Sequence, residues 1–272
     1  MQARSYLFVP GDRPERFDKA LNAGADAIIL DLEDAVSDSI KDTARDMVLR
    51  WISPKHPAYI RINGSDSPWH ADDMRAFAKH PGVRGLVLPM AEDRAAIEAI
   101  SSQLTKAADL IPIAETARAI WQIDDIAQAE GVTRIAFGSI DFQGDTRSTA
   151  SENEEELLYA RSRIVIASKV AGIQAPADGV TVALDDNHRL KADTQRAKRF
   201  GFTAKLCIHP KQIQTVNELF SPSKDDIEWA QGVLAAVEAA SDSGSIRWQG
   251  QMVDKPVIER ARQIIRLSTT SR

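Results

Sequence analysis

The strongest constraint on the fold is an alternation of short apolar runs with helix-like segments, repeated eight times in about 210 residues. The apolar runs begin at Ser5, Ala25, Ala58, Gly85, Leu110, Arg134, Ala177 and Thr203. Alternating strand and helix patterns predict a parallel sheet, and eight units predict an α/β fold of the (β/α)8 TIM-barrel class. A doubly wound open sheet is the alternative. It is disfavoured because no Gly-x-Gly-x-x-Gly turn follows the first run.

The chain beyond Gln212 has a different pattern from the repeated units. A helix is predicted over 225–240, a polar linker over 241–245, and a last helix through about Leu267. We therefore predict a catalytic TIM-barrel domain over 1–220 and a C-terminal helical extension over 221–272. An apolar tail that follows a complete barrel is expected to pack on a neighbouring subunit.

Composition excludes several classes of protein. The 272 residues are 43% hydrophobic, which is enough for a sizeable core, and the net charge of -5 argues against a nucleic-acid partner. The lone Cys207 excludes an intrachain disulfide framework and suits a reducing compartment. The apolar run near the N-terminus is too short for a signal peptide, and no stretch approaches a membrane span. We expect a cytoplasmic protein without a membrane partner.

Two short acidic stretches carry the first functional signal. One is the run from Leu110 to Glu115, and the other is the run from Arg134 to Asp141; a helix-like segment over 117–129 separates them. In a parallel α/β fold the carboxyl ends of the strands lie side by side. We therefore expect Glu115 and Asp141 to hold one divalent cation. The alternative is that each acid caps the helix that follows it.

Polar side chains also follow the second and third runs. Asp31, Glu33 and Asp34 place three carboxylates within four residues. Crowded acids repel one another unless a cation or a hydrogen-bond donor lies among them, and one helix cap needs fewer than three. Arg61 lies near the end of the third run, and its planar guanidinium suits the carboxylate of a substrate. The alternative for Arg61 is an ion pair with one of the three acids, and both can hold.

A basic group lies near the start of the first helix. Arg13, Arg16 and Lys19 are three residues apart and fall roughly along one face. Basic side chains beside a helix N-terminus suit a phosphate or a carboxylate. The alternative is a solvated helix face. His209 ends the eighth run, and we assign it a structural role.

Several motifs together resemble the HpcH/HpaI aldolase/citrate lyase β-subunit family, and within it the citryl-CoA and malyl-CoA lyase branch. They are Arg4-Ser-Tyr-Leu-Phe-Val-Pro-Gly-Asp-Arg13, Gly24-Ala-Asp-Ala-Ile-Ile-Leu-Asp-Leu-Glu-Asp-Ala-Val36, Arg61-Ile-Asn63, Ala114-Glu-Thr-Ala-Arg118, Leu206-Cys-Ile-His-Pro210 and Gly250-Gln-Met-Val-Asp-Lys-Pro256. They follow the expected order over nearly the whole chain.

The resemblance implies a carbon–carbon lyase that depends on Mg2+, with Mn2+ as the alternative. It would cleave or form a β-hydroxyacyl-CoA such as citryl-CoA, malyl-CoA or citramalyl-CoA, with acetyl-CoA and an α-keto acid as the other side of the reaction. The implied metal ligands are Glu115 and Asp141. The implied catalytic residues are Arg61, Glu33 and Asp254, with Asp254 contributed by a neighbouring subunit of a homotrimer or hexamer. The implied substrate-binding residues are Arg61, Glu115, Arg13, Arg16 and Lys19, of which the last three meet the CoA phosphates.

The chain departs from the family pattern at two places near this site. Ala119 stands where a glycine is usual, and Phe-Gln-Gly-Asp-Thr-Arg over 142–147 replaces the common Leu-Gly after the metal aspartate. We expect a reshaped loop over the metal. Two other functions stay open: a metal-dependent pyruvate aldolase acting on free hydroxy-keto acids, and a citrate lyase β-subunit that acts only within its assembly.

Overall fold

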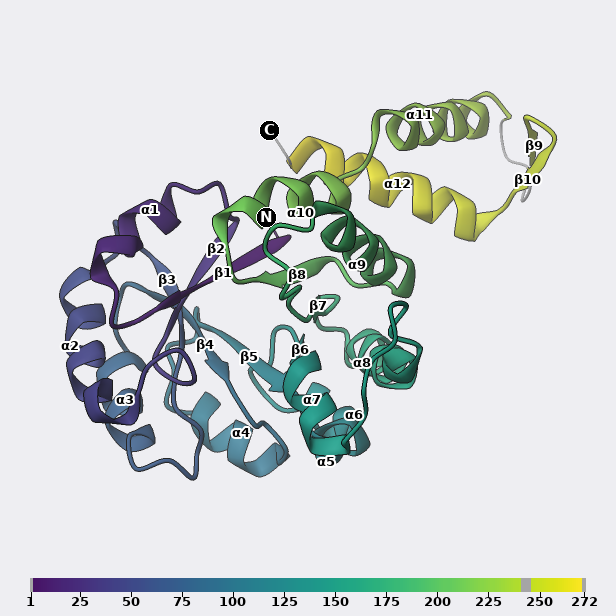
Figure 1. Ribbon diagram of the computed structural model, residues 1–272. Coiled ribbons are helices and arrows are strands. Elements are labelled where there is room, and N and C mark those ends of the chain that lie inside the picture. Colours follow the sequence, from purple (N-terminus) through teal and green to yellow (C-terminus); the bar gives the residue numbers. More distant parts are fainter. Residues whose placement is uncertain (1, 241–245, 271–272) are drawn as a thin grey trace. The chain divides into compact units, whose positions relative to one another are not determined.

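A computed structural model describes residues 2–240 and 246–270. Eight parallel strands follow one another in chain order and close into a barrel, because β8 pairs with β1. The predicted TIM barrel is confirmed, and Figure 1 shows helices around the outside of the strands. The strands are β1 Ser5–Pro10, β2 Ala27–Asp31, β3 Ala58–Arg61, β4 Val83–Leu88, β5 Asp109–Ala114, β6 Ala136–Phe137, β7 Ala177–Asp178 and β8 Ala204–Cys207.

The helices follow the strands in the expected alternation. They are α1 Phe17–Leu21, α2 Lys41–Trp51, α3 His70–Phe77, α4 Arg94–Ser101, α5 Ala117–Trp121, α6 Ile123–Ala127, α7 Ser139–Thr146, α8 Leu158–Ala171, α9 Asn187–Phe200 and α10 Ile213–Phe220. Short 3-10 turns precede α1, α2, α8 and α10, namely η1 Pro14–Arg16, η2 Asp38–Ile40, η3 Glu155–Leu157 and η4 Pro210–Gln212.

The period of the strands decides which side chains reach the barrel interior. Ile29, Tyr59 and Ile113 belong to the buried cluster that fills the barrel. Successive side chains of a strand point to opposite faces, so the residue two positions further on faces the same way. Asp31 and Arg61, two positions after Ile29 and Tyr59, therefore share the interior side at the carboxyl ends of the strands.

Among the differences from the predicted elements, one helix is broken and one strand is shorter than expected. The helix expected over 117–129 is broken at Gln122 into α5 and α6, because Gln122 leaves the helical backbone with φ -96° and ψ 13°. The strand expected over 177–182 ends at Asp178, after two residues. Gly179 follows directly, and a Cβ there would collide with Ser139, so the chain passes α7 too closely for any larger residue.

The chain divides into two compact units, Gln2–Asn217 and the residues from Glu218 onward. In the second unit α11 Lys224–Ala239 and α12 Lys255–Thr270 lie side by side, with a hairpin of β9 Ile246–Trp248 and β10 Gln251–Val253 at one end (Figure 1). Buried Val233 and Val253 belong to its own apolar core. The linker predicted over 241–245 lies outside the described residues. In the part of the chain that is described, no helix is both long and apolar enough to cross a bilayer.

Candidate active site

A pocket of about 360 Å3 opens at the carboxyl ends of the barrel strands. Its polar lining comes from four strand ends or the turns after them and includes Asp31, Arg61, Glu115 and Asp141. Its apolar lining includes Phe8, Pro10, Ile113, Phe137, Val180, Leu206 and Ile208. The carboxyl ends of the strands form the face where TIM-barrel enzymes carry out their chemistry.

Arg61 is the one basic side chain among the residues that line this pocket. Its Nε and Nη2 donate to the two carboxylate oxygens of Asp31 at 2.7 Å and 2.6 Å. Both side chains are buried, and the guanidinium also stacks over the Phe8 ring, 4.9 Å from its centroid. The predicted ion pair between Arg61 and a strand-two acid is confirmed. The bidentate geometry fixes the orientation of the guanidinium, as substrate positioning requires.

Two further acids approach the same guanidinium. Glu33 Oε2 lies 2.8 Å from Arg61 Nη1, in an ionic contact that lacks hydrogen-bond alignment, and Asp34 accepts from Nη1 at 3.3 Å. Burial raises the pKa of Glu33 to about 7, with Arg61 opposing and Asp34 and Asp31 adding to the rise. A carboxyl group with a pKa near neutrality can both accept and donate a proton at physiological pH.

Glu115 directly follows β5 and is almost fully buried. Its Oε1 accepts the backbone N–H of Met90 at 2.6 Å. Burial raises the pKa of Glu115 to about 8; the Met90 hydrogen bond opposes the shift, while Asp141 and Glu33 add to it. Gly138 packs against this carboxylate so closely that a Cβ there would collide with Oε2. The site therefore requires glycine at position 138 for steric reasons.

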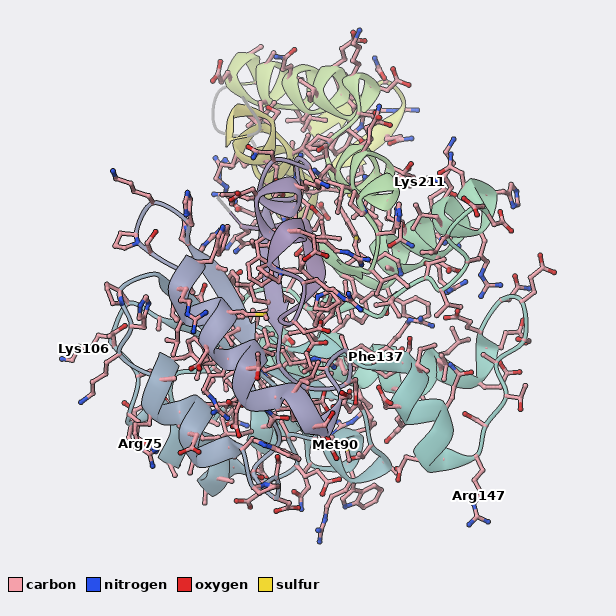
Figure 2. The ribbon with its side chains drawn as sticks, turned by 60° about the vertical axis from the view of Figure 1, so that its left-hand side comes forward. Arg75, Met90, Lys106, Phe137, Arg147 and Lys211 are labelled. Atoms are coloured by element: carbon pink, nitrogen blue, oxygen red, sulfur yellow. The ribbon has the colours of Figure 1, made fainter. Side chains whose placement is uncertain are left out.

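Asp141 does not lie at the end of a strand, and that prediction was wrong. Strand β6 ends at Phe137, and Asp141 lies in the first turn of α7, where its side chain is exposed. The segment expected to be a reshaped loop is also helical, through Thr146, and ends where Arg147 takes a left-handed backbone and extends into solvent (Figure 2). Asp141 nevertheless lines the same pocket as Glu115.

The charges at this pocket do not balance. When they are ionised, the three acids around Arg61, together with Glu115 and Asp141, outnumber the single positive charge of Arg61. The ionised acids would repel an anionic substrate. Burial raises the pKa values of Glu33 and Glu115, and the neighbouring acids add to the rise. The described residues contain no group of three or more His, Cys, Asp or Glu side chains arranged as a metal site. Two carboxylates are nonetheless enough for Mg2+, because this ion keeps several water molecules as its other ligands.

The basic residues of the first helix lie outside the set that lines this pocket. Arg13 precedes η1, and Arg16 ends it, each with its side chain more than half exposed. Their nearest acids are the adjacent Asp12, at 3.5 Å, and Glu15, at 3.8 Å. Lys19 is exposed on α1. The three stay available to a charged ligand because these exposed pairs are weak.

Asp254 and His209 both serve as helix caps. Asp254 precedes α12 in the second unit, and its Oδ1 accepts the N–H of Val257 at 3.3 Å. His209 precedes η4, and its Nδ1 accepts the N–H of Lys211 at 3.1 Å. The contact of His209 agrees with the structural role expected for it.

The sequence pattern did not reveal the side chains that hold the acidic segment in place. Buried Lys41 donates from Nζ to the carbonyl oxygens of Leu32 and Glu33 at 3.1 Å and 3.0 Å. Buried Asp73 holds a different segment, the one after β3, because it accepts from both the backbone and the side-chain amide of Asn63. Each residue lies on the next helix, eight to ten residues along the chain from the groups it holds, and helical periodicity alone carries no signal for such contacts.

A second group that the sequence pattern missed is centred on Glu154. Its carboxylate contacts Arg161 at 2.6 Å, Arg189 at 2.8 Å and Arg196 at 2.7 Å. Arg161 also pairs with buried Asp178 at the end of β7. These ion pairs fix the segment between α7 and α8 against the barrel, and they place Glu154 in a structural role.

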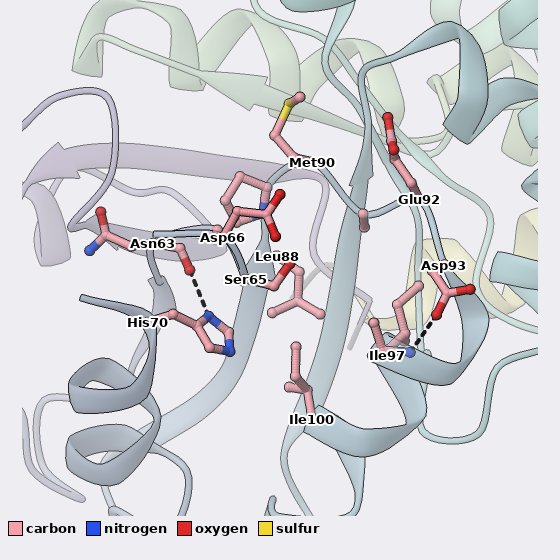
Figure 3. Close-up of a pocket in the computed structure, with 14 residues that line it drawn as sticks. Asn63, Ser65, Asp66, His70, Leu88, Met90, Glu92, Asp93, Ile97 and Ile100 are labelled. Atoms are coloured by element: carbon pink, nitrogen blue, oxygen red, sulfur yellow. Dashed lines mark hydrogen bonds between the residues drawn. The ribbon is translucent and has the colours of Figure 1, made fainter. Parts of the chain in front are cut away.

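A second pocket, of about 280 Å3, lies between the loop after β3 and the loop after β4 (Figure 3). The Asn63 carbonyl can only accept, so the His70 Nδ1 that faces it at 2.9 Å carries the proton. Glu92 lies on the opposite wall in Figure 3. The Met90 amide that binds Glu115 lies on the same wall, so this wall separates the two pockets.

Comparisons with known proteins identify the family of the chain. Residues 4–210 match the HpcH/HpaI aldolase/citrate lyase family. The citrate lyase subunit beta of Leuconostoc mesenteroides subsp. cremoris is 34% identical, over 98% of this chain and 94% of the relative. The mitochondrial citramalyl-CoA lyase of Rattus norvegicus is 28% identical, over 98% of this chain and 86% of the relative.

Among solved structures, the chain resembles the protein CitE from Mycobacterium tuberculosis in complex with magnesium, acetoacetate and coenzyme A. The TM-score is 0.85 and the identity 32%, over 98% of both chains. The predicted enzyme class, a lyase, is confirmed at the level of the family. The family match and the curated relatives lead to one identification: the chain belongs to the HpcH/HpaI aldolase/citrate lyase family.

Proposed function

We propose that this protein is a Mg2+-dependent carbon–carbon lyase that cleaves a β-hydroxyacyl-CoA to acetyl-CoA and an α-keto acid, or catalyses the reverse reaction. One observation carries the proposal: buried Glu115 and exposed Asp141 line the same pocket as the oriented Arg61. The excess of negative charge there needs a cation before an anionic keto acid can bind. Citryl-CoA, malyl-CoA and citramalyl-CoA are the candidate substrates.

Glu115 and Asp141 would hold the cation, and their oxygen ligands suit Mg2+ or Mn2+. When bound, a divalent cation would polarise the oxygen at the carbon where the bond breaks. The CitE structure that this chain resembles contains magnesium together with acetoacetate and coenzyme A, which supports both the cation and the substrate class.

Arg61 would bind the carboxylate of the keto acid. A guanidinium has five N–H donors, and Asp31 accepts two of them in a bidentate pair. Asp34 accepts a third donor at 3.3 Å, and the two donors that remain can bind a second carboxylate. The bidentate pair also holds the guanidinium rigid, so less conformational freedom is lost when the substrate binds.

Glu33 would accept the proton of the β-hydroxyl group. As the O–H bond breaks, the carbonyl of the keto acid forms, and the electron pair of the breaking C–C bond moves onto the thioester as an enolate. Proton transfer to the α-carbon then gives acetyl-CoA, with Asp254 of a neighbouring subunit as the proposed donor. The pKa of about 7 supports Glu33 in this role.

The remaining assignments concern CoA and assembly. We assign Arg13, Arg16 and Lys19 to the CoA phosphates, since all three are exposed cations next to a helix start. We assign the second unit to a homotrimer or hexamer contact. The segments after β4, β6, β7 and β8, at the face of the pocket, carry exposed apolar side chains that support a covering partner: Met90, Ile140, Val182, Leu184 and Ile208. The single buried thiol suits the cytoplasm.

The experiment that tests this function is a screen of acyl-CoA thioesters and free hydroxy-keto acids with the purified chain and Mg2+. Coupled detection of glyoxylate, pyruvate or oxaloacetate identifies the keto acid. Cleavage of a CoA thioester supports the proposal, whereas cleavage of free hydroxy-keto acids alone would favour a pyruvate aldolase.

The second candidate is a β-subunit that acts only within a citrate lyase assembly, and the relative named citrate lyase subunit beta favours it. A chain that binds Mg2+ but cleaves nothing alone, and gains activity only with partner subunits, would establish that candidate. Mass measurement of the active species reports the oligomeric state. A fully active monomer would exclude a role for Asp254 across a subunit boundary.

A further inference from the structure

Two carboxylates that do not line the pocket of Arg61 and Glu115 hold the segment that follows Glu115. Thr116 donates from Oγ1 to Glu92 Oε1 at 2.6 Å, on the side of the loop after β4. On the opposite side, the backbone N–H of Ala117 donates to Asp145 Oδ2 at 2.7 Å. Asp145 lies on α7, four residues after Asp141. One hydrogen bond therefore joins the helix of Asp141 to the turn of Glu115.

We propose that Asp145 is a positioning residue that sets the placement of Asp141 relative to Glu115 for cation binding. The proposal rests on the proposed function, because it takes these two carboxylates as the cation ligands. Asp145 and Asp141 share one helix, so a shift of α7 moves them together. Ala117 begins α5 only two residues after Glu115, so the Asp145 contact limits how far the two carboxylates can move apart.

The surroundings show why this contact has a specific effect. Strand β6 has only two residues, so the sheet itself holds the start of α7 with few hydrogen bonds. Asp141 is exposed, so burial does not fix its position. Gly138 lies against Glu115, and its N–H donates to the Ala114 carbonyl at 3.1 Å, which holds the start of α7 but not its later turns. The Asp145 hydrogen bond is a direct tie between α7 and the turn after Glu115.

The role differs from that of a surface acid that only adds charge. Asparagine keeps a side-chain oxygen that can accept the Ala117 N–H, whereas alanine does not. Asp145 is exposed and alanine favours helices, so the substitution leaves the fold of α7 in place. Groups that orient metal ligands typically change metal affinity about 10- to 100-fold when removed.

The test measures the dissociation constant for Mg2+ by calorimetry on the full chain, without substrate. The variants are Asp145→Ala, Asp145→Asn and the control Asp125→Ala, which removes an exposed acid from α6. We expect Asp145→Ala to raise the dissociation constant about tenfold, Asp145→Asn less than about threefold, and Asp125→Ala to leave it unchanged. Urea unfolding of the cation-free variants is expected to show similar midpoints.

Two results would overturn the positioning role. One is a dissociation constant for Mg2+ in Asp145→Ala that equals the wild-type value. The other is an equal loss of affinity in Asp145→Ala and Asp145→Asn, because that result assigns the effect to charge instead of the hydrogen bond. A wild-type chain that binds no Mg2+ is a separate outcome: it overturns the proposed function itself, and this inference with it.

Discussion

Asp31 and Arg61 are direct partners across neighbouring strands β2 and β3, and two parallel hydrogen bonds of 2.7 Å and 2.6 Å join their side chains. The two residues are therefore paired both in the backbone register of the strands and through their side chains. This pair joins the two strands beside the pocket and orients the guanidinium towards the pocket. Its loss has consequences for stability as well as for binding.

Replacing Asp31 with alanine leaves the Arg61 guanidinium buried without its main partner. We expect Asp31→Ala to lower the free energy of unfolding by about 3–5 kcal/mol, measured by urea denaturation. Asp34→Ala is the matched control, because Asp34 is 65% exposed and contacts the same guanidinium at 3.3 Å. Its expected cost is below about 1 kcal/mol. Equal losses in the two variants would show that the bidentate pair has no special role.

Gly138 and Gly144 allow a comparison within one segment. A Cβ at Gly138 would collide with the Glu115 side chain, whereas a Cβ at Gly144 meets no atom within 4 Å. We expect Gly138→Ala to weaken Mg2+ binding at least about tenfold, measured by calorimetry. Gly144→Ala, inside helix α7, is expected to bind normally and to gain about 0.5–1 kcal/mol of stability. Normal Mg2+ binding by Gly138→Ala would remove the steric argument for glycine.

The raised pKa of Glu115 predicts a pH dependence for the cation-free protein. Burial, with Asp141 adding to it, raises the pKa from the ordinary 4.5 to about 8. Between these values the folded state binds more protons than the unfolded state. The free energy of unfolding therefore falls as pH rises through this window, by up to about 1.4 kcal/mol per pH unit from this group.

The control for this prediction is Glu115→Gln, which lacks the titrating group. Urea unfolding in the presence of a chelator, from pH 5 to pH 8, is expected to show wild type losing stability relative to Glu115→Gln as pH rises. In wild type, Mg2+ binding at pH 7 should also release protons, seen as a buffer-dependent heat in calorimetry. Parallel pH profiles for the two proteins would show that Glu115 is ionised throughout this range.

Cys207 is expected to be inert in the folded protein. The residue is 1% exposed, and burial raises the pKa of its thiol to about 12. Because the thiolate is the reactive form, a disulfide reagent at pH 8 should label no thiol until denaturant is added, and then one thiol per chain. Stoichiometric labelling of the native protein within minutes would contradict the buried, protonated state.

The barrel and the Asp31–Arg61 part of the site could be predicted from local sequence patterns. The placement of Asp31 and Arg61 depends on strand period and on strand ends, and both can be read from short stretches of sequence. Asp141 could not be placed this way. Whether the run ends at Phe137 or continues to Asp141 depends on the approach of Gly138 to Glu115, which is a contact between separate βα units. Sequence periodicity carries no information on such contacts.

The supporting groups were missed for a similar reason. The Met90 amide that binds Glu115 is a backbone group, so no side-chain pattern marks it. Its left-handed backbone, with φ 50°, is visible only in the folded chain. The hairpin of the second unit turns through Gln249 and Gly250, both with positive φ, and its three-residue strands are too short to show alternation. These features depend on tertiary structure.

The most direct test of the account is the effect of Glu115→Gln on Mg2+-dependent cleavage. Glutamine keeps the size of the side chain and an oxygen for the Met90 N–H, but it removes the negative charge that the cation needs. With the CoA thioester that wild type cleaves fastest, we expect Mg2+-dependent formation of the keto acid to fall at least about 1,000-fold, as for loss of a group essential to the transition state. The apo fold should persist. Unchanged Mg2+-dependent turnover in Glu115→Gln would contradict the assignment of Glu115 as a cation ligand, and with it the proposed site.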